Sequence, residues 1–395
     1  MIAPNYKAMV SAESVIRIMN NKALERMKVC GKENVFNFTI GNPSVPAPPE
    51  TAEIIKDLLD HEDPMLLHGY NDRHGIPLVR EQIAASLTRR IGLPYTAKHI
   101  FMCSGATAAL AHALRAVSVP GEEIVYFAPN FPEYRIYVEA SGAVPRIVPP
   151  RTEDFQIDFA ALERLLSEKT AAVLINSPNN PSGVVYSTAT IERLAELLRQ
   201  KSRAYGHKIY LISDEPYREI IFKGVDSPVI SRYYDDTIIC YSFAKGASIP
   251  GERIGYVAVS PRCQEAELIV QMCPQISRCT GHNCPSSLMQ LLAGRMADLT
   301  ADLSVYERNA ELMYGKLKEL GFECVRPGGT FYLFPKALEE DSVAFCERAL
   351  QHNLVFVPGD SFGCPGWFRI SCCVPTERIE RAFPNLEALA AEYRT

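Results

Sequence analysis

The sequence contains one lysine, Lys245, whose neighbours make it a candidate for covalent chemistry. Ser242 stands three residues before it and Arg253 eight residues after it, in a stretch that glycine and proline interrupt. A lysine amine can form a Schiff base with an aldehyde, and a hydroxyl and a guanidinium can bind a phosphate beside it. The spacing therefore suits a phosphate-bearing aldehyde, although the same three residues taken alone would more often belong to a solvated surface loop.

A second candidate for phosphate binding is the segment Gly105, Ala106 and Thr107, which follows an apolar run and opens an alanine-rich helical pattern. Small residues at a helix start let backbone N–H groups approach an anion at the positive end of the helix dipole. Because they also serve close helix packing, they are a weak signal alone. Together with Ser242 and Arg253, they make a complete phosphate cup.

Polar and aromatic side chains stand at the ends of three further apolar runs. If the aldehyde is pyridoxal phosphate, Asp214 could pair with its pyridine nitrogen and keep that nitrogen protonated. Glu215 is a rival for this role, and an acid that is merely solvated is the alternative for either residue. Asn180 and Tyr217 could donate hydrogen bonds to the phenolic oxygen of that cofactor, although the prolines and glycine around Asn180 would make a turn in any protein. Phe131 could stack on its ring or be a plain core residue.

These motifs follow short apolar runs that alternate with amphipathic helical stretches over residues 99–259. This alternation predicts an α/β fold with a mostly parallel sheet covered by helices on both faces. Ligands of such sheets bind at the carboxyl ends of the strands, where the candidate residues stand. The clearest helix is predicted to have Ser187 or Thr188 as its N-cap. The predicted strands are 100–104, 123–127, 171–176, 208–213, 237–241 and 253–258.

The pattern changes after about Pro285. A long helical stretch through Leu320 is followed by short apolar runs and a terminal helix, which predicts a smaller α+β domain that the N-terminal segment joins. Four prolines between residues 43 and 49 predict a stiff crossing segment. The expected division is residues 1–40 for the N-terminal arm and part of the small domain, 41–285 for the large cofactor-binding domain, and 286–395 for the C-terminal small domain.

In this order and combination, the segments resemble those of fold-type I pyridoxal-phosphate enzymes, and specifically the class I and II aminotransferases related to aspartate aminotransferase. The resemblance runs from Gly41 to Arg369, nearly the whole chain. It implies a large domain with a seven-stranded, mostly parallel sheet sandwiched by helices, together with a smaller α+β domain. It also implies pyridoxal 5'-phosphate as the cofactor and a homodimer with shared active sites.

The resemblance also implies a role for each matching residue. Lys245 corresponds to the lysine that forms the Schiff base and moves the Cα proton, and Asp214 to the partner of the pyridinium nitrogen. Asn180 and Tyr217 correspond to the donors to the phenolate. The remaining matches to the cofactor site are ring stacking by Phe131 and phosphate binding by Gly105, Ala106, Thr107, Ser242 and Arg253.

Substrate and dimer contacts are implied in the same way. Arg369 corresponds to the arginine that binds the substrate α-carboxylate in a bidentate fork, which a lysine could not reproduce. Asn180 is also expected to contact the substrate. Gly41 corresponds to a residue whose backbone lies beside the substrate when the small domain closes, or else is a simple turn before Pro43. Tyr70 corresponds to the tyrosine that reaches the phosphate of the neighbouring subunit.

The implied activity is transfer of an amino group from an L-amino acid to a 2-oxoacid, with 2-oxoglutarate as the expected acceptor, by ping-pong chemistry. An aspartate-type donor is weakly favoured, but Thr107 stands where some dicarboxylate-specific relatives have a lysine, so alanine, aromatic and branched donors stay open. A β-lyase or decarboxylase of the same fold would use the same electron sink. A non-enzymatic regulator would need a helix-turn-helix domain, for which we expect no room before Gly41.

The composition is that of a soluble globular chain of 395 residues with 47% hydrophobic content and a formal net charge of -5. Without a basic surplus or a dense run of lysine and arginine, nucleic acid and membrane surfaces are not expected as partners. The first twenty residues carry Lys7, Glu13 and Arg17, which predicts neither a secretory signal nor a membrane span. The twelve cysteines form no Cys-x-x-Cys pair, so reduced thiols, a cytoplasmic location and no bound metal are expected.

Overall fold

The centre of the molecule is a seven-stranded sheet with the strand order β2-β8-β7-β6-β5-β3-β4. The computed structural model describes residues 2, 7, 9–10 and 14–394, so the start of the N-terminal arm expected over residues 1–40 lies outside the described residues. All neighbouring strands are parallel except β8, which is antiparallel to both β2 and β7. The strands are β2 (Ile100–Cys103), β3 (Glu123–Phe127), β4 (Val144–Val148), β5 (Thr170–Asn176), β6 (Tyr210–Asp214), β7 (Thr237–Ser242) and β8 (Gly255–Val259).

Six of these strands coincide with the predicted apolar runs, and the predicted mostly parallel α/β sheet is confirmed. The strand that the pattern missed is β4, at the edge of the sheet. Val144 and Ile147 of this strand are exposed, and Pro145 and Arg146 stand between them. An edge strand needs no continuous apolar run, because one of its sides faces solvent.

Helices cover both faces of the sheet, as the alternating pattern predicted. They are α5 (Pro77–Ile91), α6 (Ala106–Val117), α7 (Glu133–Ala140), α8 (Phe159–Leu165), α9 (Thr188–Tyr205), α10 (Phe243–Gly246), α11 (Ala266–Thr280) and α12 (Ser287–Arg295). On one face, α6 and α11 pack on the strands through a cluster that includes Ala109 and Ile269. On the other, α8 and α9 pack through Leu162 and Leu194, with α5 and α12 alongside. The predicted cap of α9 is Ser187, whose side chain accepts a hydrogen bond from the Thr190 N–H.

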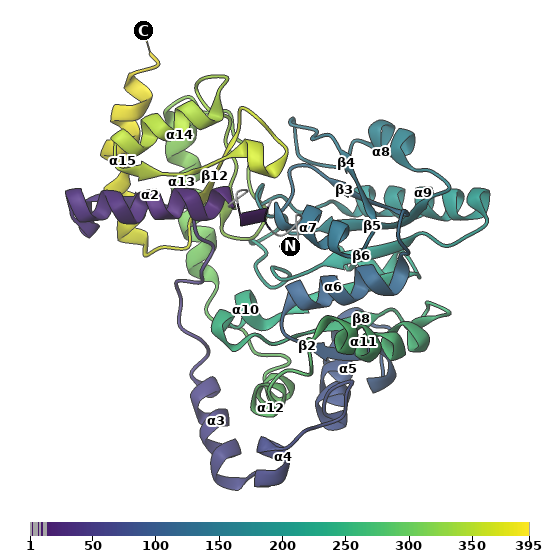
Figure 1. The fold of residues 1–395 in the computed structure, drawn as a ribbon. Coiled ribbons are helices and arrows are strands. Elements are labelled where there is room, and N and C mark those ends of the chain that lie inside the picture. The colour runs from purple at the N-terminus through teal and green to yellow at the C-terminus, as the bar shows by residue number, and fades with distance from the viewer. Residues whose placement is uncertain (1, 3–6, 8, 11–13, 395) are drawn as a thin grey trace.

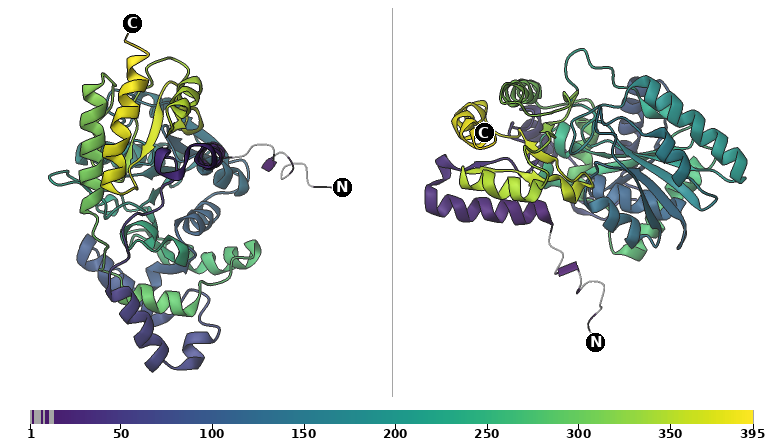
Figure 2. Two further views of the ribbon diagram at one scale, coloured as in Figure 1. Left: turned by 90° about the vertical axis from the view of Figure 1, so that its left-hand side faces the viewer. Right: turned by 90° about the horizontal axis from the view of Figure 1, so that it is seen from above.

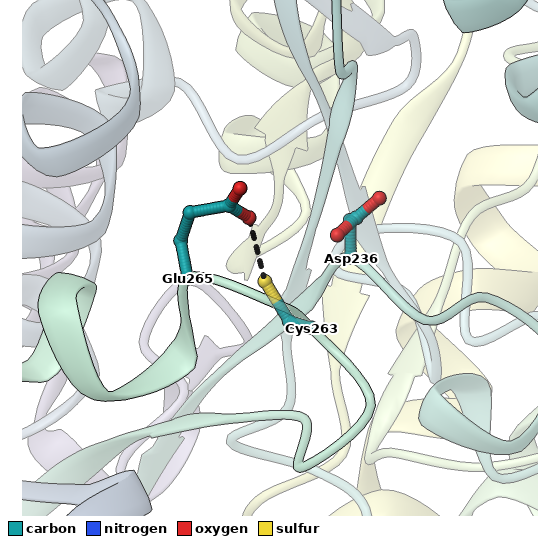
Figure 3. Close-up of side chains that lie close together, drawn as sticks. All are labelled: Asp236, Cys263 and Glu265. Carbon is teal, nitrogen blue, oxygen red and sulfur yellow. Dashed lines mark hydrogen bonds between the residues drawn. The ribbon is translucent and has the colours of Figure 1, made fainter.

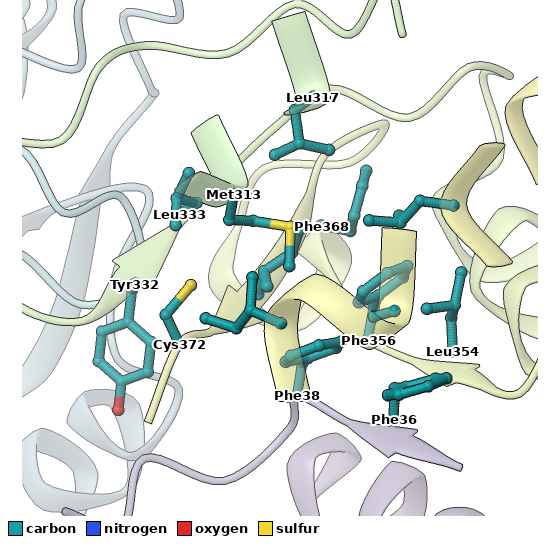
Figure 4. Close-up of a cluster of buried hydrophobic side chains, with 14 of the residues drawn as sticks. Phe36, Phe38, Met313, Leu317, Tyr332, Leu333, Leu354, Phe356, Phe368 and Cys372 are labelled. Atoms are coloured by element: carbon teal, nitrogen blue, oxygen red, sulfur yellow. The ribbon is translucent and has the colours of Figure 1, made fainter. Parts of the chain in front are cut away.

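A second, smaller body combines the C-terminal part of the chain with the N-terminal helix, and Figures 1 and 2 show the two side by side. Figure 4 shows its core, where Phe36 and Phe38 from the N-terminal segment lie against Phe356 and Phe368. Its helices and strands are α2 (Val15–Cys30), β1 (Phe36–Asn37), α13 (Ser304–Glu319), β9 (Tyr332–Leu333), α14 (Ser342–Gln351), β10 (Leu354–Val355), β11 (Val357–Pro358), β12 (Phe368–Ser371) and α15 (Thr376–Ala391). β1 pairs with β10, and β12 lies between β11 and β9.

The stretch from Pro285 to Leu320 is divided into α12 and α13 and is not one long helix. Apolar residues continue through the break, so the sequence pattern does not reveal it. At the break, the Ala301 N–H donates a hydrogen bond to the carbonyl of Gly246, beside Lys245. Because α12 packs against α5 of the large domain, we propose that the small domain begins near Ser304 and not at residue 286.

The segment between the two bodies carries α3 (Glu50–His61) and α4 (Pro64–His68), which protrude at the bottom of Figure 1. Leu59, Met65, Tyr70 and Leu78 are exposed along this protrusion and the start of α5. Within the described part of the chain, no helix combines the length and the apolar character that crossing a bilayer would require.

Candidate active site

A cavity of about 410 Å³ lies at the carboxyl ends of β5, β6 and β7. This is the position at which ligands bind in open α/β sheets. It is also lined by residues from the small domain and from the segment that crosses between the domains. The predicted site residues that line it are Gly41, Ala106, Thr107, Phe131, Asn180, Asp214, Tyr217, Ser242, Lys245, Arg253 and Arg369.

Lys245 lies in the short helix α10, directly after β7. Ser242 caps this helix, because its hydroxyl accepts a hydrogen bond from the Ala244 N–H at 3.2 Å. The Lys245 Nζ donates to the carbonyl of Gly41 at 2.5 Å. Burial disfavours the charged ammonium and lowers the pKa of Lys245 to about 8. At pH 7, about a tenth of the amine is therefore neutral and nucleophilic.

Asp214 ends β6 and has one oxygen without a partner. The Tyr134 hydroxyl donates to its Oδ2 at 2.5 Å, whereas its Oδ1 is buried and makes no hydrogen bond. Burial raises the pKa of Asp214 to about 7. A buried carboxylate oxygen in this state is costly unless a donor, preferably a cationic one, approaches it from the cavity.

Glu215, the rival acid in the sequence, is used elsewhere. One of its oxygens accepts a hydrogen bond from the Ser213 hydroxyl, and the other lies 3.8 Å from Arg218. It does not line the cavity, whereas Asp214 does. Only Asp214 can therefore serve a ligand there.

Three of the residues predicted to bind a phosphate, Gly105, Ser242 and Arg253, lie around one common space. Gly105 precedes α6 with φ at 86°, a left-handed conformation that favours glycine. A Cβ on Gly105 would come within 3.0 Å of the Arg253 Nη2 and 3.4 Å of the Ser242 Oγ. The missing Cβ leaves room where a hydroxyl, a guanidinium and the first turn of a helix converge, and this donor set fits a phosphate.

Arg369 is a buried cation without a carboxylate partner. Its side chain lies on β12 and is 1% exposed, and no salt bridge to it is found among the described residues. Nη1 donates to the Asn180 side-chain oxygen at 2.9 Å and Nη2 to the Thr39 carbonyl at 2.5 Å, while Nε has no partner. Burial lowers the pKa of Arg369. A buried guanidinium in this state is stabilised by any anion that enters the cavity.

Two tyrosines and a glycine close the small-domain side of the cavity. The Tyr217 hydroxyl lies 3.4 Å from that of Tyr332, and the Tyr332 ring lies 4.6 Å from the Arg369 guanidinium carbon. A Cβ on Gly41 would stand 1.8 Å from the Tyr332 hydroxyl. Gly41 is therefore required by this close approach, and a simple turn does not explain it.

Several lining residues escaped the sequence analysis. Tyr134 and Tyr137 lie on α7, one and two turns after Phe131. In the sequence they resemble aromatic residues on the packed face of an ordinary helix. Tyr332 is hidden in an apolar run that predicts a strand. The available signal for Tyr134 was chemical: a buried Asp214 would need a donor. The other lining residues not singled out are Ile16, Ile40, Asn42, Leu110, Asn176, Pro216, Ala244 and Pro250.

Tyr70 is not brought into the cavity. Its side chain is fully exposed, with a relative exposure of 101%, on the protrusion that carries α3 and α4. Within one chain it does not line the cavity, so we propose that any role of Tyr70 there requires a second copy.

A separate group of side chains, Asp236, Cys263 and Glu265, has its ligand atoms within 4.8 Å of one another (Figure 3). The Cys263 thiol donates to Glu265 at 3.8 Å. Lys208 supplies the cation for this group, because its Nζ lies 3.3 Å from Asp236 and also contacts Glu265. The one ammonium contacts both carboxylates and offsets part of their charge, so the cluster can form without a metal.

The whole chain resembles known aminotransferases. The sequence model of the family "Aminotransferase class I and II" matches residues 33–386. The aspartate aminotransferase of Thermotoga maritima is 30% identical over 96% of this chain and 97% of its own. The aromatic-amino-acid aminotransferase 2 of Thermococcus litoralis is 28% identical over 92% of this chain and 93% of its own.

Solved structures agree with this result. An aminotransferase from Eubacterium rectale matches all of both chains with a TM-score of 0.97 and 41% identity. The aspartate aminotransferase from Thermus thermophilus with maleate matches 96% of this chain and 98% of its own, with a TM-score of 0.84 and 26% identity. The fold and the resemblance expected from the sequence are confirmed, and the chain belongs to the class I and II aminotransferase family.

Proposed function

We propose that the protein uses pyridoxal 5'-phosphate to move an amino group from an L-amino acid to a 2-oxoacid, with 2-oxoglutarate as the first acceptor to test. One observation carries the proposal: the cavity unites an amine with a lowered pKa, an unpaired carboxylate oxygen and an unpaired buried guanidinium. These belong to Lys245, Asp214 and Arg369. The cofactor would supply an aldehyde for the Lys245 amine and a protonated nitrogen for the Asp214 oxygen, and an amino acid would supply a carboxylate for Arg369.

The cavity residues fit the cofactor group by group. When bound, pyridoxal phosphate supplies an aldehyde that reacts with amines and a ring that stabilises negative charge on the substrate Cα. Asp214 Oδ1 would accept from the protonated ring nitrogen and hold the proton there. Ser242, Arg253 and the start of α6 would bind the phosphate. Phe131 would lie against the ring.

Lys245 and Arg369 would handle the substrate. The Arg369 guanidinium would bind the α-carboxylate and fix the orientation of Cα, so that one Cα bond is aligned for cleavage. The Lys245 amine would hold the aldehyde in the resting enzyme and, once released from it, take the Cα proton and return it to the product. Gly41, through its carbonyl, would keep this amine near Cα.

Asn180 and Tyr217 would donate to the phenolic oxygen of the cofactor. The Asn180 side-chain oxygen already accepts from Arg369, which leaves its Nδ2 free to donate toward the cavity. Burial, followed by the neighbouring Tyr332 hydroxyl, raises the pKa of Tyr217, so it remains a neutral donor. Asn180 thereby connects the substrate arginine to the cofactor site.

A homodimer with shared active sites is part of the proposal. Leu59, Met65, Tyr70 and Leu78 are exposed along the protrusion formed by α3, α4 and the start of α5. Exposed apolar side chains are suited to burial against a second copy, which would bring Tyr70 of one chain to the phosphate of the other.

A cytoplasmic location is proposed as well. All twelve cysteines are free thiols, as expected in a reducing compartment. Small-molecule substrates remain the expected partners, whereas binding to nucleic acid or to membrane surfaces is not expected.

The direct test separates transamination from the chemistry of a β-lyase or decarboxylase. The purified protein, loaded with pyridoxal phosphate, is incubated with amino acids and 2-oxoglutarate, and the new 2-oxoacid and glutamate are measured. Equal amounts of both products are expected. Release of pyruvate and ammonia from a cysteine-type substrate, or of carbon dioxide, at a higher rate would favour the alternative enzymes.

Attachment of the cofactor to the cofactor-free protein is expected to speed up with pH and to level off near pH 8. Only the neutral amine attacks an aldehyde, and burial lowers the pKa of Lys245 to about 8. Below this value the neutral fraction rises about tenfold per pH unit, and above it the fraction is nearly constant. The rate is followed by the absorption of the cofactor after mixing. A plateau reached only near the ordinary lysine value of 10.5 would contradict the lowered pKa.

Replacing Tyr134 by phenylalanine is expected to weaken cofactor binding by about tenfold or more. Its hydroxyl makes the one hydrogen bond found to the Asp214 carboxylate, and a hydrogen bond to a charged group contributes about 1.5–3 kcal/mol. The measurement is the Kd of pyridoxal phosphate. Tyr126→Phe is a matched control, because the buried Tyr126 hydroxyl has no partner. Equal affinities of the two variants would argue against this role of Tyr134.

A further inference from the structure

Two charged side chains are buried close to the cavity without lining it. Arg218 and Glu219 follow Tyr217 in the turn after β6, and their side chains are only 10% and 8% exposed. The Arg218 Nε donates to the Glu219 Oε1 at 2.8 Å. Because taking a charged pair out of water is costly, the pair is weak evidence for stability and suggests another role.

The Glu219 carboxylate is held in place by contacts from three elements. Its Oε1 also accepts from the Tyr241 hydroxyl at 3.1 Å, and Tyr241 directly precedes Ser242 on β7. The Arg218 guanidinium carbon lies 3.7 Å from the centroid of the Tyr241 ring. From the last turn of α5, Arg90 lies 3.8 Å from the same oxygen and donates to the Arg218 carbonyl at 3.1 Å. The carboxylate is therefore fixed from β7, from α5 and from its own turn.

The second oxygen of this carboxylate lies against the residue that follows Lys245. A Cβ on Gly246 would stand 2.7 Å from the Glu219 Oε2, and the three atoms nearest to it would all belong to Glu219. This oxygen has no hydrogen-bond partner in the described part of the chain. The Gly246 carbonyl accepts from the Ala301 N–H at 2.9 Å. The backbone beside Lys245 is thus packed against Glu219 and hydrogen-bonded to Ala301.

We propose, resting on the proposed function, that Glu219 is a positioning residue for Lys245. The helix α10 that carries Lys245 is only four residues long, so a shift of its backbone moves the amine directly. A carboxylate that is fixed from three elements and packed against Gly246 prevents such a shift. A small displacement of a reacting group can cost about tenfold to 10²-fold in rate.

Glu219 affects the position of the amine and not its ionisation. Burial sets the pKa of Lys245 at about 8, and Glu219 is not among the groups that shift it further. Neither Arg218 nor Glu219 lines the cavity, so their replacement removes no group that would bind the cofactor. Loss of positioning is therefore expected to lower a rate and to leave the pH dependence and the cofactor affinity nearly unchanged.

The test follows the attachment of pyridoxal phosphate to the cofactor-free protein by absorption, over a range of cofactor concentrations and pH values. In Glu219→Ala, the maximal rate at saturating cofactor is expected to fall about tenfold. The half-saturating concentration should change little, and the rate should still level off near pH 8. In Glu219→Gln, which keeps an oxygen for Arg218 and Tyr241, most of the rate should return.

Glu123→Ala is the matched control. Glu123 begins β3, its side chain is 6% exposed, it accepts from the Arg146 Nε at 2.8 Å, and it does not line the cavity. Its replacement also takes a buried carboxylate away from an arginine, so it reports any general effect of lost stability. An equal loss of rate in Glu123→Ala, a wild-type rate in Glu219→Ala, or a plateau that moves to higher pH would overturn the role of Glu219.

Two variants at Gly246 test the contact itself and do not depend on the folding of Glu219→Ala. Gly246→Ala is expected to slow attachment about tenfold, because the new Cβ would displace the carboxylate. Adding Glu219→Asp, whose side chain is shorter by one methylene, should restore part of the rate, a coupling that independent sites do not show. A wild-type rate in Gly246→Ala, or no recovery in the double variant, would contradict the contact.

The outcomes separate this inference from the function on which it rests. If the wild-type protein attaches no cofactor, the proposed function is overturned and the positioning role with it. If the wild type attaches the cofactor and the Glu219 and Gly246 variants do so at the same rate, only the role of Glu219 is wrong.

Discussion

Replacement of Lys245 by alanine is expected to lower the rate of transamination by about 10⁴-fold, the upper end of what one proton-transferring side chain contributes. Lys245 supplies the one amine that lines the cavity within the described residues. Its loss removes both the covalent anchor for the aldehyde and the group that takes the Cα proton. Alanine is a good helix former, so α10 and the cap from Ser242 should persist.

Two measurements identify the cause of this loss. Borohydride reduction followed by mass spectrometry should find the cofactor joined to the wild-type chain and absent from the variant. Added small amines should restore part of the proton transfer in Lys245→Ala, which a misfolded protein would not allow. Lys98→Ala, which removes an exposed lysine paired with Glu267, is the control. A Lys245→Ala enzyme with wild-type activity would end the proposed chemistry.

The positions of Asn180, Asp214 and Lys245 could be predicted because each follows a strand of a parallel sheet. β5, β6 and β7 are neighbours in the sheet and point the same way, so their carboxyl ends meet. Recognising the three strands by their apolar runs was then sufficient to bring the three motifs together. No knowledge of long-range packing was needed for this part of the site.

The pattern of strands and helices does not predict Arg369 and Gly41 as site residues. Neither stands at the end of a strand in the large sheet, and the residues around them suggest nothing more than a strand and a turn. Family resemblance alone singled them out. The structure supplies the physical reasons: the Arg369 cation is buried without a carboxylate, and Gly41 touches the Tyr332 hydroxyl.

Other features depend on packing that a sequence pattern does not encode. Tyr332 lies in an apolar run, and its hydroxyl reaches the cavity only because β9 is placed beside the crossing segment. The break between α12 and α13 interrupts no apolar periodicity. In the edge strand β4, Val144 and Ile147 are exposed, and the strand lacks the continuous apolar run that is typical of a buried strand. In each case the deciding contact comes from a residue distant in the sequence.

The Asp214→Asn variant is expected to lose about 10²- to 10³-fold in the rate of transamination, the range typical of removing one preorganised electrostatic partner. The amide has nearly the same shape and can still accept from the Tyr134 hydroxyl. It carries no negative charge, however, so it cannot hold a proton on the ring nitrogen of the cofactor. The ring would then stabilise the charge on Cα poorly, while phosphate binding by Ser242 and Arg253 is retained. Pre-steady-state measurement of the amino-acid half-reaction reports this step.

Although Asp214→Asn should lower the rate of transamination, it should raise the stability of the cofactor-free protein. Burial raises the pKa of Asp214 from 3.8 to about 7, so the folded protein binds more protons than the unfolded chain between these values, and stability falls as pH rises through this window. Asp214→Asn removes the ionisable group. Without cofactor, the variant should therefore melt at a higher temperature than wild type at about pH 8, with a smaller difference at about pH 5. A wild-type chain that is the more stable at the higher pH would show that Asp214 is not strained by burial. A buried, charged oxygen that lowers the stability of the cofactor-free protein is expected of a functional residue whose partner is supplied by the ligand.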